Sequence, residues 1–161
     1  MSLHPAIRDR HAAPEPLGDI GTRWWVYLPF RLIITVATVL LFDQAIFAGQ
    51  FLAGTFGALH THRENATYAG LTTLGAAIAA ILIRWPGRGA LWPFFASLGL
   101  FGLIALQIML GFARTLAVHI PLGVTIIVLA VLLTIWGWRP HRANSPAVPI
   151  LVPVLEGAGM R

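Results

Sequence analysis

Residues 118–138 read VHIPLGVTIIVLAVLLTIWGW, a run of twenty-one residues without a charged side chain. A helix that crosses the hydrocarbon core of a bilayer needs about 20 predominantly apolar residues, and this run meets that length. Because the bilayer core holds no water, the backbone must satisfy its own hydrogen bonds there, which leaves helices or a closed barrel. The long unbroken run indicates a membrane-spanning helix.

Three further apolar stretches precede this run, separated by short breaks that are polar or contain proline or glycine. The 161-residue chain is 57% hydrophobic and 11% charged, with a mean hydropathy of +0.77, which is far from an average soluble domain. The sequence therefore predicts an all-α fold, an integral membrane four-transmembrane-helix bundle. The predicted spans are Tyr27–Gln50, Ala66–Ile83, Leu91–Phe112 and Val118–Trp138.

The chain is long enough for a single membrane domain over residues 1–161. A polar N-terminal segment, 1–23, precedes the bundle, which is expected over 24–138. The segment 139–161 is a Pro-rich C-terminal tail, where repeated proline removes the donors that a helix needs.

Arginine positions predict the orientation of the bundle. All eleven positive residues are arginine. With four spans threaded alternately, nine of them lie on the side of the termini and only Arg63 and Arg114 on the other. Cytoplasmic segments carry the excess of positive charge, so both termini are expected in the cytoplasm, N-in/C-in, in a multi-pass protein of the cell inner (plasma) membrane. The nine are Arg8, Arg10, Arg23, Arg31, Arg84, Arg88, Arg139, Arg142 and Arg161.

Composition also excludes several classes of site. There are no cysteines, which rules out disulfides, thiol nucleophiles and Cys-ligated clusters. The net charge of +5 raises the question of nucleic acid, but arginines at membrane boundaries set topology. The expected partner is the lipid bilayer, with no nucleic acid.

Two histidines are the main candidates for a site. His62 precedes the second predicted span and His119 opens the fourth, so both are expected at similar depth on the outward side. Imidazoles on two helices of one bundle are what a b-type haem requires at its two axial positions. Arg63 and Arg114, on the same side, are placed to pair with the haem propionates. The sequence thus suggests haem b as cofactor, with His62 and His119 as metal ligands and Arg63 and Arg114 as cofactor-binding residues.

Simpler explanations exist for each of these residues. A histidine at a helix end can hydrogen-bond a loop carbonyl, and the arginines can anchor lipid phosphates. His60 is an alternate ligand, because a small shift of the helix start exchanges it with His62. In a helix the two lie about 200° apart around the axis and cannot face one site together. Asp43 is expected to pair with Arg114 or Arg63, and three glutamines are expected to bond between helices. These are Gln44, Gln50 and Gln107.

The stretch Leu106–Thr115, followed by Val118-His119, resembles the corresponding hairpin in one half of haem A synthase. The pair His62-Arg63 looks like that family's His-Arg pair. In that family each half is a four-helix bundle whose paired histidines ligate a haem near the outer face, so the resemblance implies His62 and His119 as axial ligands. The run from Asp43-Gln44 through Ala53-Gly54, together with the histidine-bearing second helix, looks equally like small bacterial four-span b-type-cytochrome-like proteins, a resemblance that implies no activity.

Two departures separate the chain from that family. It has one bundle where the common enzyme has two, although half-length members that could pair as dimers are known. It also has Leu59 where the family's catalytic glutamate precedes the histidine by three positions. These departures argue against haem A synthesis even if haem is bound.

The residues therefore predict a membrane haem-binding protein for electron transfer or haem handling, with haem held between the second and fourth helices near the outer face. No catalytic acid, base or nucleophile is evident, so no catalytic residue is assigned. If the chain were an enzyme, it would be a haem-dependent membrane oxidoreductase. The alternative is a haem-free accessory or scaffolding subunit of a larger membrane complex. A homodimer is compatible with either reading.

Overall fold

Four α-helices make up the computed structural model, which describes residues 24–140. Each is long and apolar enough to cross a membrane, so the chain is a multi-pass membrane protein with the predicted four-helix bundle. The predicted segment 1–23 and the tail beyond residue 140 lie outside the described residues. In chain order the helices are α1 (Trp24–Leu52), α2 (Ala58–Arg84), α3 (Trp92–Phe112) and α4 (Leu116–Trp138).

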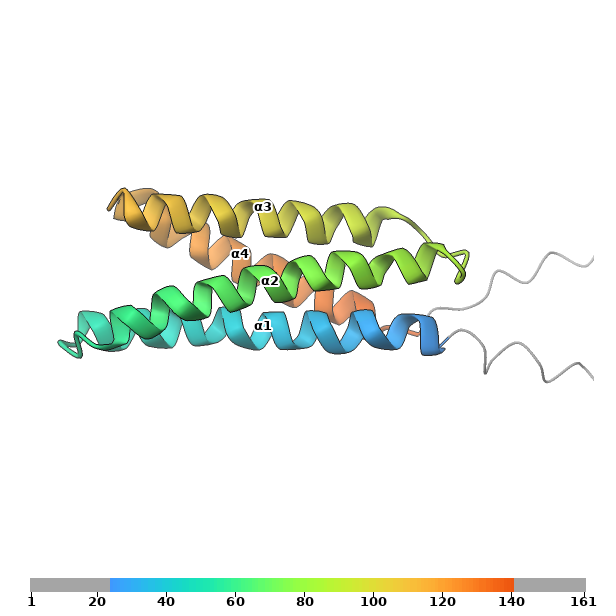
Figure 1. The fold of residues 1–161 in the computed structure, drawn as a ribbon, viewed down its shortest axis with the longest axis horizontal. Helices are drawn as coiled ribbons and strands as arrows, with labels where there is room; N and C mark the ends of the chain where they lie inside the picture. The colour runs from blue at the N-terminus through green and yellow to red at the C-terminus, as the bar shows by residue number, and fades with distance from the viewer. Residues whose placement is uncertain (1–23, 141–161) are drawn as a thin grey trace, which may run out of the picture.

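The helices form two hairpins, α1–α2 and α3–α4 (Figure 1). We call the end that carries the loops 53–57 and 113–115 the histidine end, and the opposite end, with the turn 85–91, the terminal end. Helix α4 crosses the bundle diagonally, from beside α3 at the histidine end to beside α1 at the terminal end (Figure 1). The two hairpins consequently separate towards the histidine end.

Small residues on α2 allow this helix to lie at the centre of the bundle. Its buried face includes Ala69, Thr73, Ala76 and Ala80, each with no exposed surface. A Cβ atom added at Gly70 would meet Ile104 of α3 at 3.6 Å, so α3 packs closely here. Close approach of backbones is how membrane helices associate, because lipid offers no hydrophobic driving force between them.

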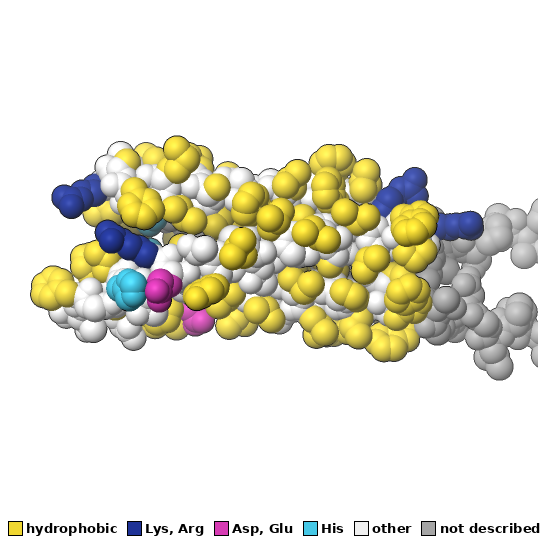
Figure 2. Space-filling model, in the orientation of Figure 1, with side chains coloured by type: hydrophobic (Ala, Val, Ile, Leu, Met, Phe, Trp, Pro, Cys, Tyr) yellow, Lys and Arg dark blue, Asp and Glu magenta, His cyan; other side chains and the backbone are white. Residues whose placement is uncertain are grey.

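The largest fully buried side chains lie along α1 and the helices that cover it. They form the apolar core of the terminal half, where α4 packs on α1. The outside of the bundle is apolar as well, as Figure 2 shows for one face, with arginine side chains gathered at the two ends. This is the surface expected of a protein that contacts lipid. The buried side chains include Phe30, Ile34, Ile83 and Ile126.

Arg31 of α1 links α1 to the last turn of α4 at the terminal end. Its Nε donates to the carbonyl oxygen of Gly137 at 2.7 Å, and its Nη2 donates to that of Arg139 at 3.5 Å. The guanidinium also lies 5.6 Å from the ring centres of Tyr27 and Trp138. A cation here is favourable because the last carbonyls of α4 have no helical partners and carry partial negative charge.

Deeper in the bundle, hydroxyl and amide side chains link the helices. Thr38 of α1 donates from Oγ1 to the carbonyl oxygen of Ile34 on its own helix at 2.8 Å, and the same Oγ1 lies 2.8 Å from Oγ1 of Thr134 on α4. Asn65 of α2 donates from Nδ2 to the carbonyl oxygen of Leu40 at 2.8 Å. Buried polar groups in lipid need such partners, since water is absent.

The predicted start of the second span was wrong by eight residues. It was placed at Ala66, whereas α2 begins at Ala58. The intervening run is polar, and its low hydropathy favours a loop when it is considered alone. It remains helical because its outward side chains need no apolar surroundings at a helix end. His60 and Glu64, for example, contact each other one turn apart, with 3.2 Å between Nε2 and Oε1.

Candidate functional site

His62 and His119 lie next to each other at the histidine end. His62 stands near the start of α2 and His119 near the start of α4, and both helices begin at this end. Their ring centres are 6.4 Å apart and the ring planes make an angle of 55°. Figure 2 shows the bundle hollowed at this end, where the two hairpins separate. The structure therefore brings together two side chains that are far apart in the sequence.

Each imidazole is fixed by the other helix of its own hairpin. The Nδ1 atom of His62 lies 3.1 Å from the backbone oxygen of Gln44 on α1. The Nδ1 atom of His119 lies 3.0 Å from the backbone oxygen of Gln107 on α3. A carbonyl oxygen can only accept a hydrogen bond, so Nδ1 must be the donor in both rings. In the neutral imidazole the other nitrogen, Nε2, then has a free lone pair.

The two glutamine side chains complete these contacts. Gln44 donates from Nε2 to the backbone oxygen of His62 at 3.0 Å. Gln107 donates from Nε2 to the backbone oxygen of His119 at 2.8 Å. Each hairpin is thus closed by two reciprocal bonds between one glutamine and one histidine. The prediction that Gln44 and Gln107 bond between helices is confirmed, whereas Gln50 lies exposed on α1 with no side-chain hydrogen bond among the described residues.

We call each pair of reciprocal bonds between a glutamine and a histidine a bracket. Glycines on α3 and α4 make room for the bracket between Gln107 and His119. A Cβ atom at Gly111 would lie 3.1 Å from Cε1 of His119, which is tighter than an ordinary contact. A Cβ atom at Gly123 would lie 2.9 Å from Nε2 of Gln107. Gly111 lies one turn after Gln107 and Gly123 one turn after His119, each on the side that the partner helix approaches. The missing side chains allow the imidazole and the amide to lie close to the opposite backbone.

His60 points away from this pair. Its side chain is 77% exposed and contacts Glu64 on the same helix. Because α2 continues through both residues, His60 and His62 lie on different faces, as expected for positions two apart in a helix. Of the two alternatives that the sequence left open, His62 is the one that lies beside His119.

Arg63 and Arg114 lie at the histidine end, near the mouth of the hollow. The guanidinium of Arg63 is 5.5 Å from the ring centre of Phe112 at the end of α3. Arg114 lies in the loop between α3 and α4 with a φ of 57°, and its side chain is exposed. Each hairpin therefore contributes one arginine to the end of the bundle that carries the histidine pair.

The expected ion pair of Asp43 with one of these arginines is not formed. Within the described residues, the one contact between a basic and an acidic side chain within 4 Å is that of His60 with Glu64, at 3.2 Å. Asp43 is partly exposed near the end of α1.

No described group of three or more His, Asp or Glu side chains could hold a metal ion. The histidine pair offers two nitrogen ligands and no third. A bare zinc site needs three or four protein ligands, which this end of the bundle does not supply from the described residues.

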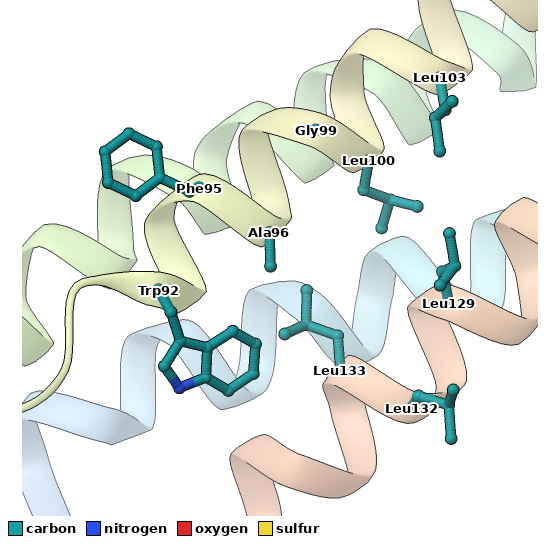
Figure 3. A pocket seen from close by; sticks show the side chains of 9 residues that line it. All are labelled: Trp92, Phe95, Ala96, Gly99, Leu100, Leu103, Leu129, Leu132 and Leu133. Carbon is teal, nitrogen blue, oxygen red and sulfur yellow. The ribbon is translucent and has the colours of Figure 1, made fainter.

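A second concave region lies between α3 and α4 towards the terminal end (Figure 3). It is a groove of about 560 Å³, left where α4 diverges from α3 to pack on α1. Its lining is apolar apart from the indole nitrogen of Trp92, and Trp92 packs against Trp136 with 4.4 Å between ring centres. The groove contains no charged or metal-ligating side chain, so it is not the candidate site.

The bracketing role of Gln44 and Gln107 was not predicted from the sequence. A signal was present, because in each hairpin a glutamine late in the first helix is matched by a histidine early in the second. The spacing differs, 18 residues in one hairpin and 12 in the other, which hides the repeat. The loops account for part of this difference, since 53–57 is longer than 113–115.

Comparison with known protein families, with curated proteins and with solved structures finds no match to this chain. The histidine pair is therefore interpreted from its own geometry.

Proposed function

We propose that this chain is a membrane haem-binding protein of the b-type cytochrome kind, with haem b held between α2 and α4 by His62 and His119. The observation that carries the proposal is the pair of neighbouring imidazoles whose Nδ1 atoms are both engaged by backbone carbonyls. Both Nε2 lone pairs are then free for a metal. Histidines that ligate metals usually have their second nitrogen bonded in this way.

The distance between the rings supports a metal between them. A metal–nitrogen bond to histidine is about 2 Å, and the ring centre lies about 1 Å beyond the nitrogen, so two imidazoles on opposite sides of one ion have centres about 6 Å apart. The observed separation is 6.4 Å.

A haem suits this pair better than a bare ion. Two protein nitrogens fill the two axial positions of a haem iron, while the porphyrin supplies the other four ligands. Arg63 and Arg114 would hold the propionates, which need cationic partners near water. The excess of arginine at the terminal end supports a cytoplasmic location for that end, which would set the haem near the outer face of the plasma membrane.

The chemistry that the haem supplies is one-electron exchange at iron. The residues of this chain would hold the iron from both sides, orient it through the brackets and exclude water with the surrounding helices. Because His62 and His119 would hold the iron from both sides, no site at the iron would be left for a small substrate. This favours electron transfer or haem handling over catalysis on a bound molecule.

The test is the absorption spectrum of the detergent-purified protein, produced with haem supplied, in its oxidised and dithionite-reduced states. The wild type is expected to show a Soret band and sharp reduced α and β bands. His62→Ala and His119→Ala should each weaken them strongly. The matched control is His60→Ala, which removes an exposed histidine of the same helix and should leave the spectrum unchanged.

A colourless wild type without extractable haem would refute the proposal. The chain would then fit a haem-free accessory or scaffolding subunit of a larger membrane complex. Loss of the bands in His60→Ala, with His62→Ala unaffected, would also contradict the assignment of the ligands.

A further inference from the structure

Gln44 and Gln107 occupy matching places in the two hairpins. Each lies on the first helix of its hairpin and bonds the backbone of the histidine on the second helix, at 3.0 and 2.8 Å. Each also presents its own backbone oxygen to that histidine's Nδ1, at 3.1 and 3.0 Å. The same two-bond bracket is therefore built twice, once around each ring.

The side-chain amide of each glutamine donates a hydrogen bond but accepts none among the described residues. The Oε1 atoms of both glutamines are buried and have no hydrogen-bond partner among the described residues. A buried acceptor without a partner lowers stability, so a glutamine whose only task was to join two helices would be a poor choice. What the amide does achieve is to hold the histidine backbone at the height where Nδ1 meets the glutamine carbonyl.

We infer that Gln44 and Gln107 are positioning residues, each of which fixes the protonation pattern and the orientation of one haem-ligating imidazole. The inference rests on the proposed function for its haem part. Neither glutamine is assigned a contact with the haem. Each acts through its own histidine, by keeping the proton on Nδ1 and the lone pair on Nε2.

This arrangement has a chemical consequence for the iron. A hydrogen bond from Nδ1–H to a carbonyl raises the basicity of the ligating nitrogen. A more basic ligand stabilises the ferric state and lowers the reduction potential. Loss of a bracket should therefore weaken haem binding and raise the potential, and it should change the angle between the ring planes, which is 55° in the structure.

The first experiment needs no haem. We would label the imidazole nitrogens of the full chain with ¹⁵N, record NMR spectra in detergent, and assign the two rings with His62→Ala and His119→Ala. In the wild type both rings should carry their proton on Nδ1. Gln44→Met should move His62 towards the Nε2–H form and leave His119 unchanged, and Gln107→Met should do the reverse.

Methionine keeps the length of glutamine and removes only its side-chain hydrogen bond, while the backbone oxygen that accepts from Nδ1 stays in place. The matched control is Gln50→Met, on the same helix as Gln44 but exposed, and it should affect neither ring. Each ring is an internal control for the variant of the other hairpin. The inference is overturned if a ring keeps its wild-type state in its own variant. It is equally overturned if one substitution moves both rings, since the glutamine would then support the bundle as a whole.

The second experiment measures haem affinity and the iron reduction potential in the same variants. Each bracket variant should bind haem about 10- to 100-fold more weakly, with a higher potential and altered electron paramagnetic resonance g values. If the wild type binds no haem, the proposed function fails while the NMR result still decides what the glutamines do to the rings. If the wild type binds haem and the variants match it in affinity and potential, the inference fails while the proposed function stands.

Discussion

Replacing Arg31 with leucine is expected to loosen the terminal end of the bundle. Arg31→Leu removes a hydrogen bond of 2.7 Å from a charged group to the carbonyl oxygen of Gly137. A bond of this kind contributes about 1.5–3 kcal/mol. It also removes contacts of the guanidinium with the rings of Tyr27 and Trp138, worth about 0.5 kcal/mol each at a partly exposed site. Because leucine recovers some packing in lipid, the free energy of unfolding should fall by about 2–3 kcal/mol.

The assay is reversible unfolding in mixed micelles of increasing SDS content, followed by far-UV circular dichroism. Arg84→Leu is the matched control, because Arg84 is exposed at the same end and has no side-chain hydrogen bond among the described residues. It should change the unfolding free energy by less than about 0.5 kcal/mol. The reasoning is refuted if Arg31→Leu stays within that margin, or if both variants lose the same stability, which would point to a general effect of charge.

Two glycine substitutions test close packing at the two ends, with Gly102→Ala as their common control, since a Cβ atom there meets nothing within 4 Å. Gly111→Ala should press on the imidazole of His119 and weaken haem binding about tenfold, which corresponds to about 1.4 kcal/mol. Haem titration measures this affinity, and a value equal to that of the control would contradict the placement of the ring. Gly87→Ala places a Cβ atom 2.6 Å from the backbone oxygen of Ile83. It should lower the unfolding free energy by about 1–3 kcal/mol in the SDS assay. Stability equal to that of the control would show that the turn 85–91 can rearrange.

The four-helix fold could be predicted from the sequence because it depends on the length and hydropathy of the apolar runs. Apolar runs of spanning length must become helices in lipid, and three of the four starts and all four ends lie within three residues of the predictions. The start of α2 differed because length and hydropathy describe the hydrocarbon core, and not the headgroup layer. In the headgroup layer a helix can continue through a polar run, such as the run from His60 to Asn65.

The candidate site was only partly predictable. Depth along each helix can be counted from the sequence, which is why His62 and His119 were expected at one level. The rotation of each helix about its axis cannot be counted, because these helices are apolar on nearly every side and no polar face marks the outside. The pairing expected for Asp43 and the bond expected for Gln50 failed for this reason, and the bracket of Gln107 around His119 required the structure to be seen.

The repeated bracket also bears on how such a protein can arise. One hairpin with a glutamine on its first helix and a histidine on its second holds half of the site without help from the other half. Two copies of a single ancestral hairpin, related by a twofold axis, would supply both halves, and joining them by gene duplication and fusion would give the present order of helices. The turn 85–91 would then mark the seam between the two copies. On that account, the unequal loops and the close contacts of Gly111 with His119 and of Gly123 with Gln107 would have arisen as the two copies diverged.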